Sequence, residues 1–278
     1  TGSVRDWNFD SDTSGRIRDK DVDSNEWFLG REKTFKFLRE RSYVFGCYQW
    51  AAVEHRGEAA WPRICSVSGA LDLFLQKKGA FYQNKSHWTK EPMAHIVPHW
   101  NFKGLEGEEI PVTVYTNCEE LELFLNGRSL GKKEIEKYGH GEWSVKYCPG
   151  TLEVKGYIGG KEVCCDKRIT TGKPAALKLT QDNDFTANGS DIALFTCECV
   201  DENGLVVPDA AEYVRFSISS PAKIIGTDIC DHNNVADTER KMYMGKIRIA
   251  VKPQKGQNNF TLTAMSDNCG LCRIVISK

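Results

Sequence analysis

Side chains that could take part in chemistry are concentrated between residues 50 and 61. Glu54 and Glu58 are four residues apart on one predicted loop, so both could point into the same site. Two carboxyl groups in one site can act as a general acid and a general base. Trp50 and Trp61 flank these carboxyl groups, and Trp50 ends an apolar run, where the wall of an active site belongs.

Each of these side chains also has a purely structural interpretation. Glu54 could form an ion pair with Arg56 or Arg63, and Trp50 could pack in a core. Glu58 follows a glycine and could fix the loop by capping or by ion pairing. The residue types alone leave both interpretations open.

Cysteines are the second group of potentially reactive side chains. The chain has 11 of them, an odd number, so at least one thiol stays free within a monomer. Cys197 and Cys199 are two residues apart, and Cys269 and Cys272 have CxxC spacing. A zinc site requires two well-spaced pairs or histidine partners, whereas both of these pairs lie in alternating strand patterns. We therefore expect them to pack as small hydrophobic side chains, with a metal or redox role as the alternative.

Other classes of function have little support. His95 and His99 have helical metal-ligand spacing, but Pro98 between them argues against a metal site. No GxSxG, HExxH, P-loop or GxGxxG motif is present, and no cofactor is expected. The net charge of −1 offers no attraction for nucleic acid, and no apolar run approaches the roughly 20 residues of a membrane span. Free thiols weakly favour the cytoplasm; a periplasmic or secreted location and an oligomeric state are left open.

Two predicted helices and one predicted strand would position the residues between 50 and 61. Helical spacing predicts helices over residues 24–40, where Asp23 and Glu26 fit a capping box, and over roughly 70–87. Between them, residues 43–50 form a nearly continuous apolar run, the pattern of a strand buried on both faces. A single strand of this kind needs sibling strands and flanking helices, so the sequence is expected to begin inside a larger α/β domain.

From about residue 95 the hydrophobic pattern alternates with a period of two. Six or so short strands, with hairpin turns at Asn126-Gly127 and Gly159-Gly160, predict a small antiparallel sandwich. After a linker at 170–174, a second series has the strand count of an immunoglobulin-like domain. Its predicted strands are 175–180, 192–201, 213–219, 222–226, 245–252, 258–265 and 271–277.

Residues 46–62 carry a recognisable motif. The run GCYQWAAVEHRGE of residues 46–58, followed by Trp61-Pro62, resembles the eighth-strand signature of glycoside hydrolase family 2, in particular its β-galactosidase-like branch. The chain has Glu54-His55 where Asp-Tyr is commoner in the family, a departure that bears on the detailed sugar contacts. Further similarity to this branch lies at 68–73, 80–88, 95–101, 114–127 and 174–189.

The resemblance implies a TIM-barrel enzyme whose last strand ends at the sugar site. It implies a sugar-stacking role for Trp50 and substrate contacts from Glu54, His55 and Trp61. The residues implied to give structural support are Arg56, Glu58, His99 and Trp100, the last two between barrel and sandwich.

The resemblance also bears on the catalytic carboxyl groups. Retaining glycosidases use two of them, about 5–5.5 Å apart, and the resemblance places both on earlier barrel strands. We therefore expect both catalytic glutamates upstream of Thr1. Glu54 and Glu58 are not expected to be that pair, because they share one loop and flanking a glycosidic bond usually takes two strands.

Together these observations predict a mainly β chain in three parts. They are the C-terminal end of a (β/α)8 barrel at 1–95, a small β-sandwich at 96–172 and an immunoglobulin-like antiparallel β-sandwich at 173–278. The expected function is that of the C-terminal region of a retaining β-glycosidase, most similar to β-galactosidases, which acts on terminal β-linked sugars.

The expected partners are a carbohydrate substrate and the upstream part of the same polypeptide. This chain would supply one wall of the sugar site and would be inactive alone. The alternative from another class is a non-catalytic carbohydrate-binding or spacer module. The helix-strand-helix start argues against that alternative, because a binding module has no use for a single barrel strand.

Overall fold

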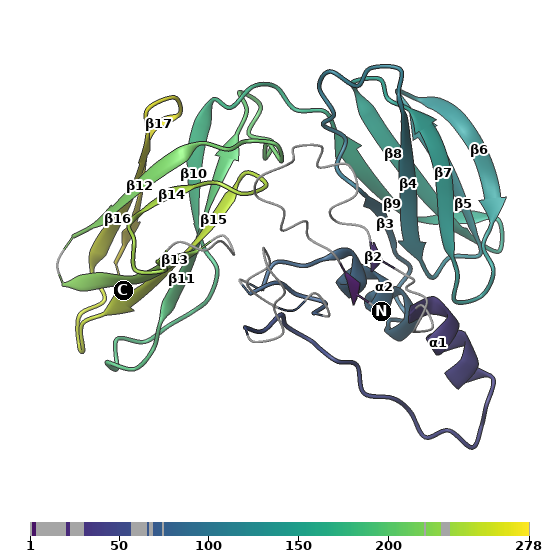
Figure 1. The fold of residues 1–278 in the computed structure, drawn as a ribbon, viewed down its shortest axis with the longest axis horizontal. Helices are drawn as coiled ribbons and strands as arrows, with labels where there is room; N and C mark the ends of the chain where they lie inside the picture. Colours follow the sequence, from purple (N-terminus) through teal and green to yellow (C-terminus); the bar gives the residue numbers. More distant parts are fainter. Residues whose placement is uncertain are drawn as a thin grey trace. The chain divides into compact units, whose positions relative to one another are not determined.

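The computed structural model describes residues 2–3, 21–22, 31–56, 66, 69–73, 75–219, 221–228 and 234–277. The chain divides into two compact units, Thr1–Thr170 and Thr171–Lys278 (Figure 1). Antiparallel sheets dominate both units and helices are few, so the expectation of a mainly β chain is confirmed. Within the described residues, no helix is long and apolar enough to cross a membrane.

The first unit begins with short elements. Strands β1 (Gly2–Ser3) and β2 (Asp21–Val22) pair with each other. Helix α1 spans Arg31–Arg39, and the predicted start of this helix, at residues 24–30, lies outside the described residues.

Helix α2 is shorter than the sequence predicts. It spans Gly79–Trp88, so it begins at residue 79 rather than near residue 70. The preceding residues are instead held in isolated β-bridges, in which Leu71 pairs with both Val53 and Lys77. Because these bridges use the backbone groups of Leu71, and the amides of Asp72 and Lys78 donate to Gln76 and Ala70, these residues do not make the hydrogen bonds of a helix.

Residues 43–50 do not form the predicted buried strand. The segment has no regular secondary structure, and the side chains of Phe45 and Tyr48 are fully exposed. In the described part of the chain, no strand of any sheet lies beside this segment. The prediction is wrong for this chain, because an apolar run becomes a buried strand only where flanking strands and helices cover it.

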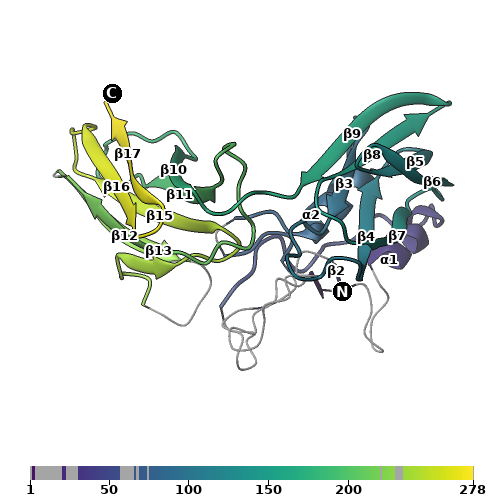
Figure 2. The same cartoon turned by 90° about the horizontal axis from the view of Figure 1, so that it is seen from above.

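Strands β3 to β9 form a sandwich of two antiparallel sheets (Figures 1 and 2). One sheet has the order β3-β4-β7 and the other the order β6-β5-β8-β9. Alternation buries one face of each sheet in a shared core, which contains Val114 of β4 and Leu121 of β5. The predicted turns at Asn126-Gly127 and Gly159-Gly160 are present, with positive φ at all four residues. The strands are β3 (Ala94–Val97), β4 (Glu109–Thr116), β5 (Glu120–Leu125), β6 (Arg128–Glu134), β7 (His140–Lys146), β8 (Thr151–Ile158) and β9 (Lys161–Ile169).

The second unit is another two-layer sandwich, with sheets β10-β11-β15-β13 and β14-β12-β16-β17 (Figure 2). Each of the seven predicted strands is present within two residues of its predicted ends, and the short β14 is an addition that the alternation did not indicate. The strands are β10 (Ala176–Gln181), β11 (Ala193–Val200), β12 (Tyr213–Ile218), β13 (Ala222–Asp228), β14 (Glu239–Lys241), β15 (Lys246–Pro253), β16 (Phe260–Ser266) and β17 (Gly270–Ile276).

The cysteines of this second sandwich pack as expected. Cys197 and Cys199 are fully buried on β11, on the face that they share with Phe195. Cys269 is buried in the same core, and Cys272 packs against it. The prediction that these four residues pack against the hydrophobic core is confirmed.

Candidate functional site

Three of the predicted sugar-site residues, Trp50, Glu54 and His55, lie on a segment, residues 49–56, that packs against the described residues of 66–78. Backbone hydrogen bonds join the two segments; the amide of Glu54, for example, donates to the carbonyl oxygen of Leu71 (2.9 Å). The approach is close, because a Cβ atom at Gly69 would lie 2.3 Å from the backbone nitrogen of Glu54. Glycine at this position therefore allows the two segments to meet.

Trp50 and His55 form a pair of rings at the surface of this segment. The side chain of Trp50 is 67% exposed. Its ring and the ring of His55 form a T-shaped pair, with centroids 5.4 Å apart and planes at 82°. Asn84 of α2 donates to Gln49 Oε1 (2.6 Å), and Gln49 Nε2 donates to the carbonyl oxygen of Ala51 (3.3 Å). Both neighbours of Trp50 are thus held in place while the indole stays accessible.

Glu54 points into the protein. Its side chain and that of Lys78 are 0% and 1% exposed, and the two form an ion pair through Lys78 Nζ and Glu54 Oε1. The hydroxyl of Ser66 donates to the other carboxylate oxygen, Oε2 (2.5 Å). The structure therefore favours the ion-pair interpretation of Glu54, although its partner is Lys78 rather than Arg56. The other predicted partner, Arg63, lies outside the described residues.

Ser66 connects Glu54 to His55. Because a hydroxyl has one proton and Ser66 donates it to Glu54, the Ser66 oxygen can only accept from His55. It accepts from the backbone amide of His55 (3.1 Å) and lies 3.2 Å from Nδ1 of the imidazole. This geometry assigns the proton to Nδ1 of His55, and in the neutral ring the other nitrogen, Nε2, is then a hydrogen-bond acceptor.

The remaining residues of the predicted site are not brought to this cluster. Arg56 is exposed, and Glu58 and Trp61 lie outside the described residues. The structure thus groups Trp50, Glu54 and His55, and their roles toward a sugar stay predictions.

His99 and Trp100 belong to the first sandwich. Trp100 is 1% exposed in its core, and its Nε1 donates to the carbonyl oxygen of Cys148 (3.0 Å). Its ring meets that of Tyr147 edge-on, at 5.2 Å. His99 stacks on Phe102, with ring centroids 4.8 Å apart. These contacts lie within the sandwich, and the predicted role of both residues between barrel and sandwich stays a prediction.

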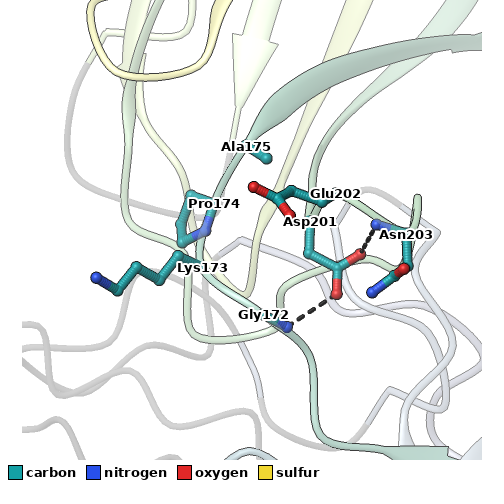
Figure 3. Close-up of a pocket in the computed structure, with 7 residues that line it drawn as sticks. All are labelled: Gly172, Lys173, Pro174, Ala175, Asp201, Glu202 and Asn203. Atoms are coloured by element: carbon teal, nitrogen blue, oxygen red, sulfur yellow. Dashed lines mark hydrogen bonds between the residues drawn. The ribbon is translucent and has the colours of Figure 1, made fainter.

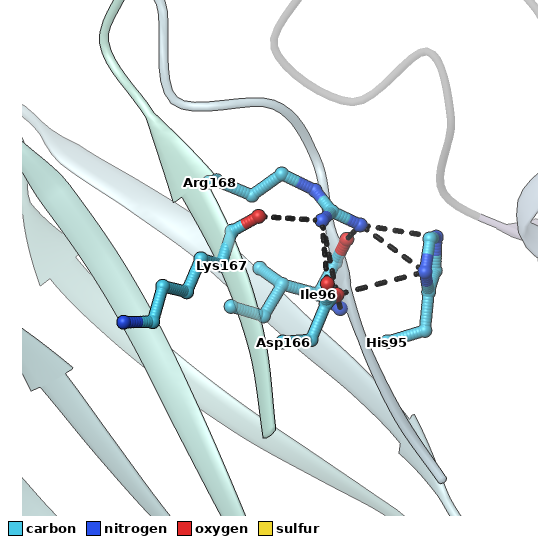
Figure 4. A network of polar contacts seen from close by, with 5 residues as sticks. All are labelled: His95, Ile96, Asp166, Lys167 and Arg168. Carbon is cyan, nitrogen blue, oxygen red and sulfur yellow. Dashed lines mark hydrogen bonds and ion pairs between the residues drawn. The ribbon is translucent and has the colours of Figure 1, made fainter. Parts of the chain in front are cut away.

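His95 takes part in a polar network between the edges of the two sheets rather than in a metal site (Figure 4). Arg168 of β9 donates to the carbonyl oxygen of Ile96 (2.6 Å) and pairs with Asp166 (3.0 Å). Burial and the nearby Arg168 lower the pKa of His95 well below its usual range, so the ring is neutral and stacks on Tyr82. Among the described residues, no group of three or more histidine, cysteine or acidic side chains could hold a metal ion.

A pocket in the second unit is lined by residues 172–175 and 201–203 (Figure 3). Its carboxylate, Asp201, accepts from the backbone amides of Gly172 (2.8 Å), Asn203 (2.9 Å) and Leu205 (2.9 Å). These bonds, led by that from Gly172, lower the pKa of Asp201. Because Asp201 is occupied by the turn that it caps, the pocket is not a strong candidate for a site.

Sequence reasoning missed Ser66 and Lys78. They are 12 and 24 residues from Glu54, too far along the chain for the repeat of one helix or strand to bring them beside it. Only the fold of residues 66–78 against 49–56 brings them to the carboxylate.

The comparisons with known proteins agree with this architecture. Residues 107–164 match the family described as a domain of unknown function (DUF4982), and residues 177–274 match the family described as glycoside hydrolase family 2 C-terminal domain 5. The chain is 34% identical over 253 residues to the β-galactosidase BoGH2A of Bacteroides ovatus, which covers 87% of this chain and 29% of that protein. It is 32% identical over 192 residues to a β-glucuronidase of Formosa agariphila, which covers 66% of this chain and 19% of that protein.

Solved structures give the same result. A β-glycosidase from Bacteroides vulgatus superimposes with a TM-score of 0.85 at 28% identity, over 92% of this chain and 34% of that one. The relatives with these two sandwiches are glycoside hydrolases. The chain belongs to glycoside hydrolase family 2, and it spans only about a third or less of the relatives described here.

Proposed function

We propose that this chain is the C-terminal region of a retaining β-glycosidase that hydrolyses terminal β-linked sugars, most similar to β-galactosidases. Membership of glycoside hydrolase family 2 and the 34% identity to a β-galactosidase support this proposal. The chain would contribute one wall of the sugar site, together with its two sandwiches.

The observation that carries the proposal is the exposed ring pair of Trp50 and His55. An indole is costly to leave in water, and its face suits the apolar face of a pyranose ring. The imidazole beside it offers a polar group for a sugar hydroxyl. A large exposed aromatic ring braced by a second ring is the arrangement expected of a sugar-binding wall.

We further propose that residues 1–95 are the end of a (β/α)8 barrel, followed by sandwiches at 96–172 and 173–278. The exposed aromatic side chains of Tyr43, Phe45 and Tyr48 support this division. They are the side chains that neighbouring barrel strands would cover, as the apolar pattern of 43–50 suggests.

The two catalytic carboxyl groups are proposed to lie upstream of this chain. Glu54 is occupied by Lys78 and Ser66 and has no access to a ligand in this arrangement. A retaining mechanism needs a nucleophile and an acid/base on opposite sides of the bond, and an enclosed carboxylate can serve as neither.

The test compares the full-length polypeptide with residues 1–278 alone on a nitrophenyl β-galactoside. We expect turnover by the full-length polypeptide only, and Trp50→Ala in it should raise KM about tenfold, equivalent to about 1.4 kcal/mol of lost binding. Turnover by residues 1–278 alone, abolished by Glu54→Gln, would contradict the proposal. Glycan binding by the full-length polypeptide without any turnover would favour a non-catalytic binding module instead.

A β-glucuronidase is the second candidate, because one of the relatives described above carries that name. The ratio of kcat/KM on nitrophenyl β-galactoside and β-glucuronide decides between them. A ratio above one supports the galactosidase, and a ratio below one supports the glucuronidase.

A further inference from the structure

We propose that Lys78 is a positioning residue for the sugar-binding wall: acting through Glu54 and Ser66, it fixes the imidazole of His55 and thereby the indole of Trp50. The inference rests on the proposed function and adds to it a residue that makes no sugar contact itself. Lys78 belongs to neither the ring pair nor the set of residues that the family resemblance points to.

The first step of the argument is the burial of the ion pair. Both side chains are almost completely inaccessible, at 1% for Lys78 and 0% for Glu54. Two charges removed from water gain little net stability from each other, because the loss of hydration offsets their attraction. A pair enclosed in this way is therefore better explained by the geometry that it imposes than by the stability that it adds.

The second step is the rigidity of Lys78 itself. Its backbone amide donates to the carbonyl oxygen of Ala70 (3.0 Å), and its own carbonyl oxygen accepts from the amide of Phe81 in the first turn of α2 (3.0 Å). The ammonium group is thus delivered from the start of a helix. Because the backbone is fixed on both sides, the position of Lys78 determines that of Glu54.

The third step is the transfer of this order to His55. Lys78 holds Oε1 of Glu54, which leaves Oε2 to accept the hydroxyl proton of Ser66. Ser66 then accepts from Nδ1 of His55 and keeps the ring in one tautomer and one plane. Without the carboxylate, Ser66 could donate to Nδ1 instead, and the tautomer would change.

The last step reaches the exposed indole. The rings of His55 and Trp50 form a T-shaped pair with centroids 5.4 Å apart, so a rotation of the imidazole removes the support of the indole. Misplacement of a substrate-positioning group by about 1 Å can cost a hundredfold in rate. A wall residue displaced in this way weakens sugar binding even though every residue that touches the sugar is unchanged.

The experiment uses the full-length polypeptide and measures kcat, KM and Tm on nitrophenyl β-galactoside. Ser66→Ala removes the link to His55 but leaves the Lys78–Glu54 pair intact. The double variant Glu54→Leu with Lys78→Met replaces the pair by apolar side chains of similar size, a change that proteins often tolerate. Lys77→Met is the matched control, because Lys77 is the adjacent lysine and is exposed.

We expect KM to rise about tenfold in Ser66→Ala and in the double variant, with kcat within about threefold. The Tm of Ser66→Ala should fall by several degrees, because Oε2 of the buried Glu54 loses its hydrogen bond, so KM is measured well below the Tm of every variant. Lys77→Met should leave all three unchanged. Lys78→Met alone leaves the buried carboxylate of Glu54 without its ion-pair partner, so this single variant is expected not to fold. Ser66→Ala and the double variant therefore test the inference.

Two results would overturn the inference, and they are distinguishable. If the unmodified polypeptide turns over the substrate but Ser66→Ala and the double variant keep its KM, Lys78 has no positioning role and the proposed function stands. If the unmodified polypeptide turns over neither the β-galactoside nor the β-glucuronide, the proposed function fails and the inference fails with it.

Discussion

The carboxylate of Glu32 in α1 is paired with the imidazole of His140 in β7, 108 residues further along the chain. Burial of Glu32 would raise the pKa of its carboxyl group, but hydrogen bonds from His140 and Lys36 outweigh that effect and lower the pKa to about 2. The hydrogen bond to Glu32 raises the pKa of His140, which burial opposes. Helix α1 is thus attached to the first sandwich by a contact that depends on the charges of both partners.

We expect this pair to stabilise the first unit most between about pH 4.5 and 6.5, the ordinary pKa values of the two groups. The contribution of Glu32 is complete above pH 4.5 and is lost as the pH falls toward 2. The contribution of His140 is complete below pH 6.5 and is lost as the pH rises through its raised pKa. Thermal unfolding of the protein between pH 2 and pH 9 measures both slopes.

Glu32→Gln removes the charge of the carboxylate while keeping the size of the side chain. It should lower Tm near pH 5.5 by about 2–4 °C and make Tm less dependent on pH on both sides of this value. Glu136 and Glu142 also contact this group, through Lys36 and His140, and they remain in the variant. The same dependence of Tm on pH in Glu32→Gln and in the unmodified protein would show that the pair does not contribute.

The contrast between the two sandwiches and the candidate site shows what a sequence can predict. Alternation on β11 places Phe195, Cys197 and Cys199 on one face, and all three are buried, because the strand period of two determines the face of each side chain. The turn at Asn126-Gly127 was equally predictable, since positive φ at both residues suits Asn and Gly.

The candidate site depends on contacts without such a period. Glu54 and Lys78 are 24 residues apart, and no local sequence pattern determines which lysine pairs with Glu54. Residues 43–50 show the opposite limit: their apolar pattern predicts a buried strand, but in the described part of the chain no strand pairs with this segment and its aromatic side chains are exposed. Sequence periodicity thus predicted the scaffold better than the site.

The polar network around Arg168 predicts that replacing the side chain of Arg168 lowers the stability of the protein. Arg168→Met removes the donor to the carbonyl oxygen of Ile96 and the partner of Asp166. Leaving these half-buried groups without their partner should cost about 1–3 kcal/mol of unfolding free energy. Chemical denaturation followed by circular dichroism measures the change. Lys167→Met on the same strand is the control. It should change the unfolding free energy by no more than about 0.5 kcal/mol, because Lys167 is half exposed. Equal losses of unfolding free energy in both variants would contradict the role of Arg168.

The cysteines should divide sharply in their reactivity. Cys47, Cys148 and Cys165 are exposed and should be alkylated by iodoacetamide within minutes, whereas Cys199 is buried. Burial raises the pKa of Cys199 to about 12, which keeps its sulfur in the unreactive thiol form. Peptide mass spectrometry before and after denaturation maps the labelled positions. Rapid native labelling of Cys199, or a fall in Tm on addition of a metal chelator, would contradict a purely hydrophobic role.

The close approach at Gly69 gives the most local prediction. A Cβ atom there would lie 2.3 Å from the backbone nitrogen of Glu54 and 2.6 Å from the carbonyl oxygen of Leu71, so Gly69→Ala must push residues 49–56 away from 66–78. Overpacking of this kind costs about 1–3 kcal/mol, and more where the obstructing atoms belong to the backbone. At Gly46, by contrast, a Cβ atom would meet nothing within 4 Å.

We therefore expect Gly69→Ala to lower the unfolding free energy of residues 1–278 by at least about 1 kcal/mol, and Gly46→Ala to leave it unchanged within about 0.5 kcal/mol. The displacement should also expose the buried pair, because Glu54 belongs to the segment that moves. Hydrogen exchange at the amide of Glu54, which donates to Leu71, reports this opening directly. Unchanged exchange and unchanged stability in Gly69→Ala would show that the two segments do not pack as closely as the structure places them.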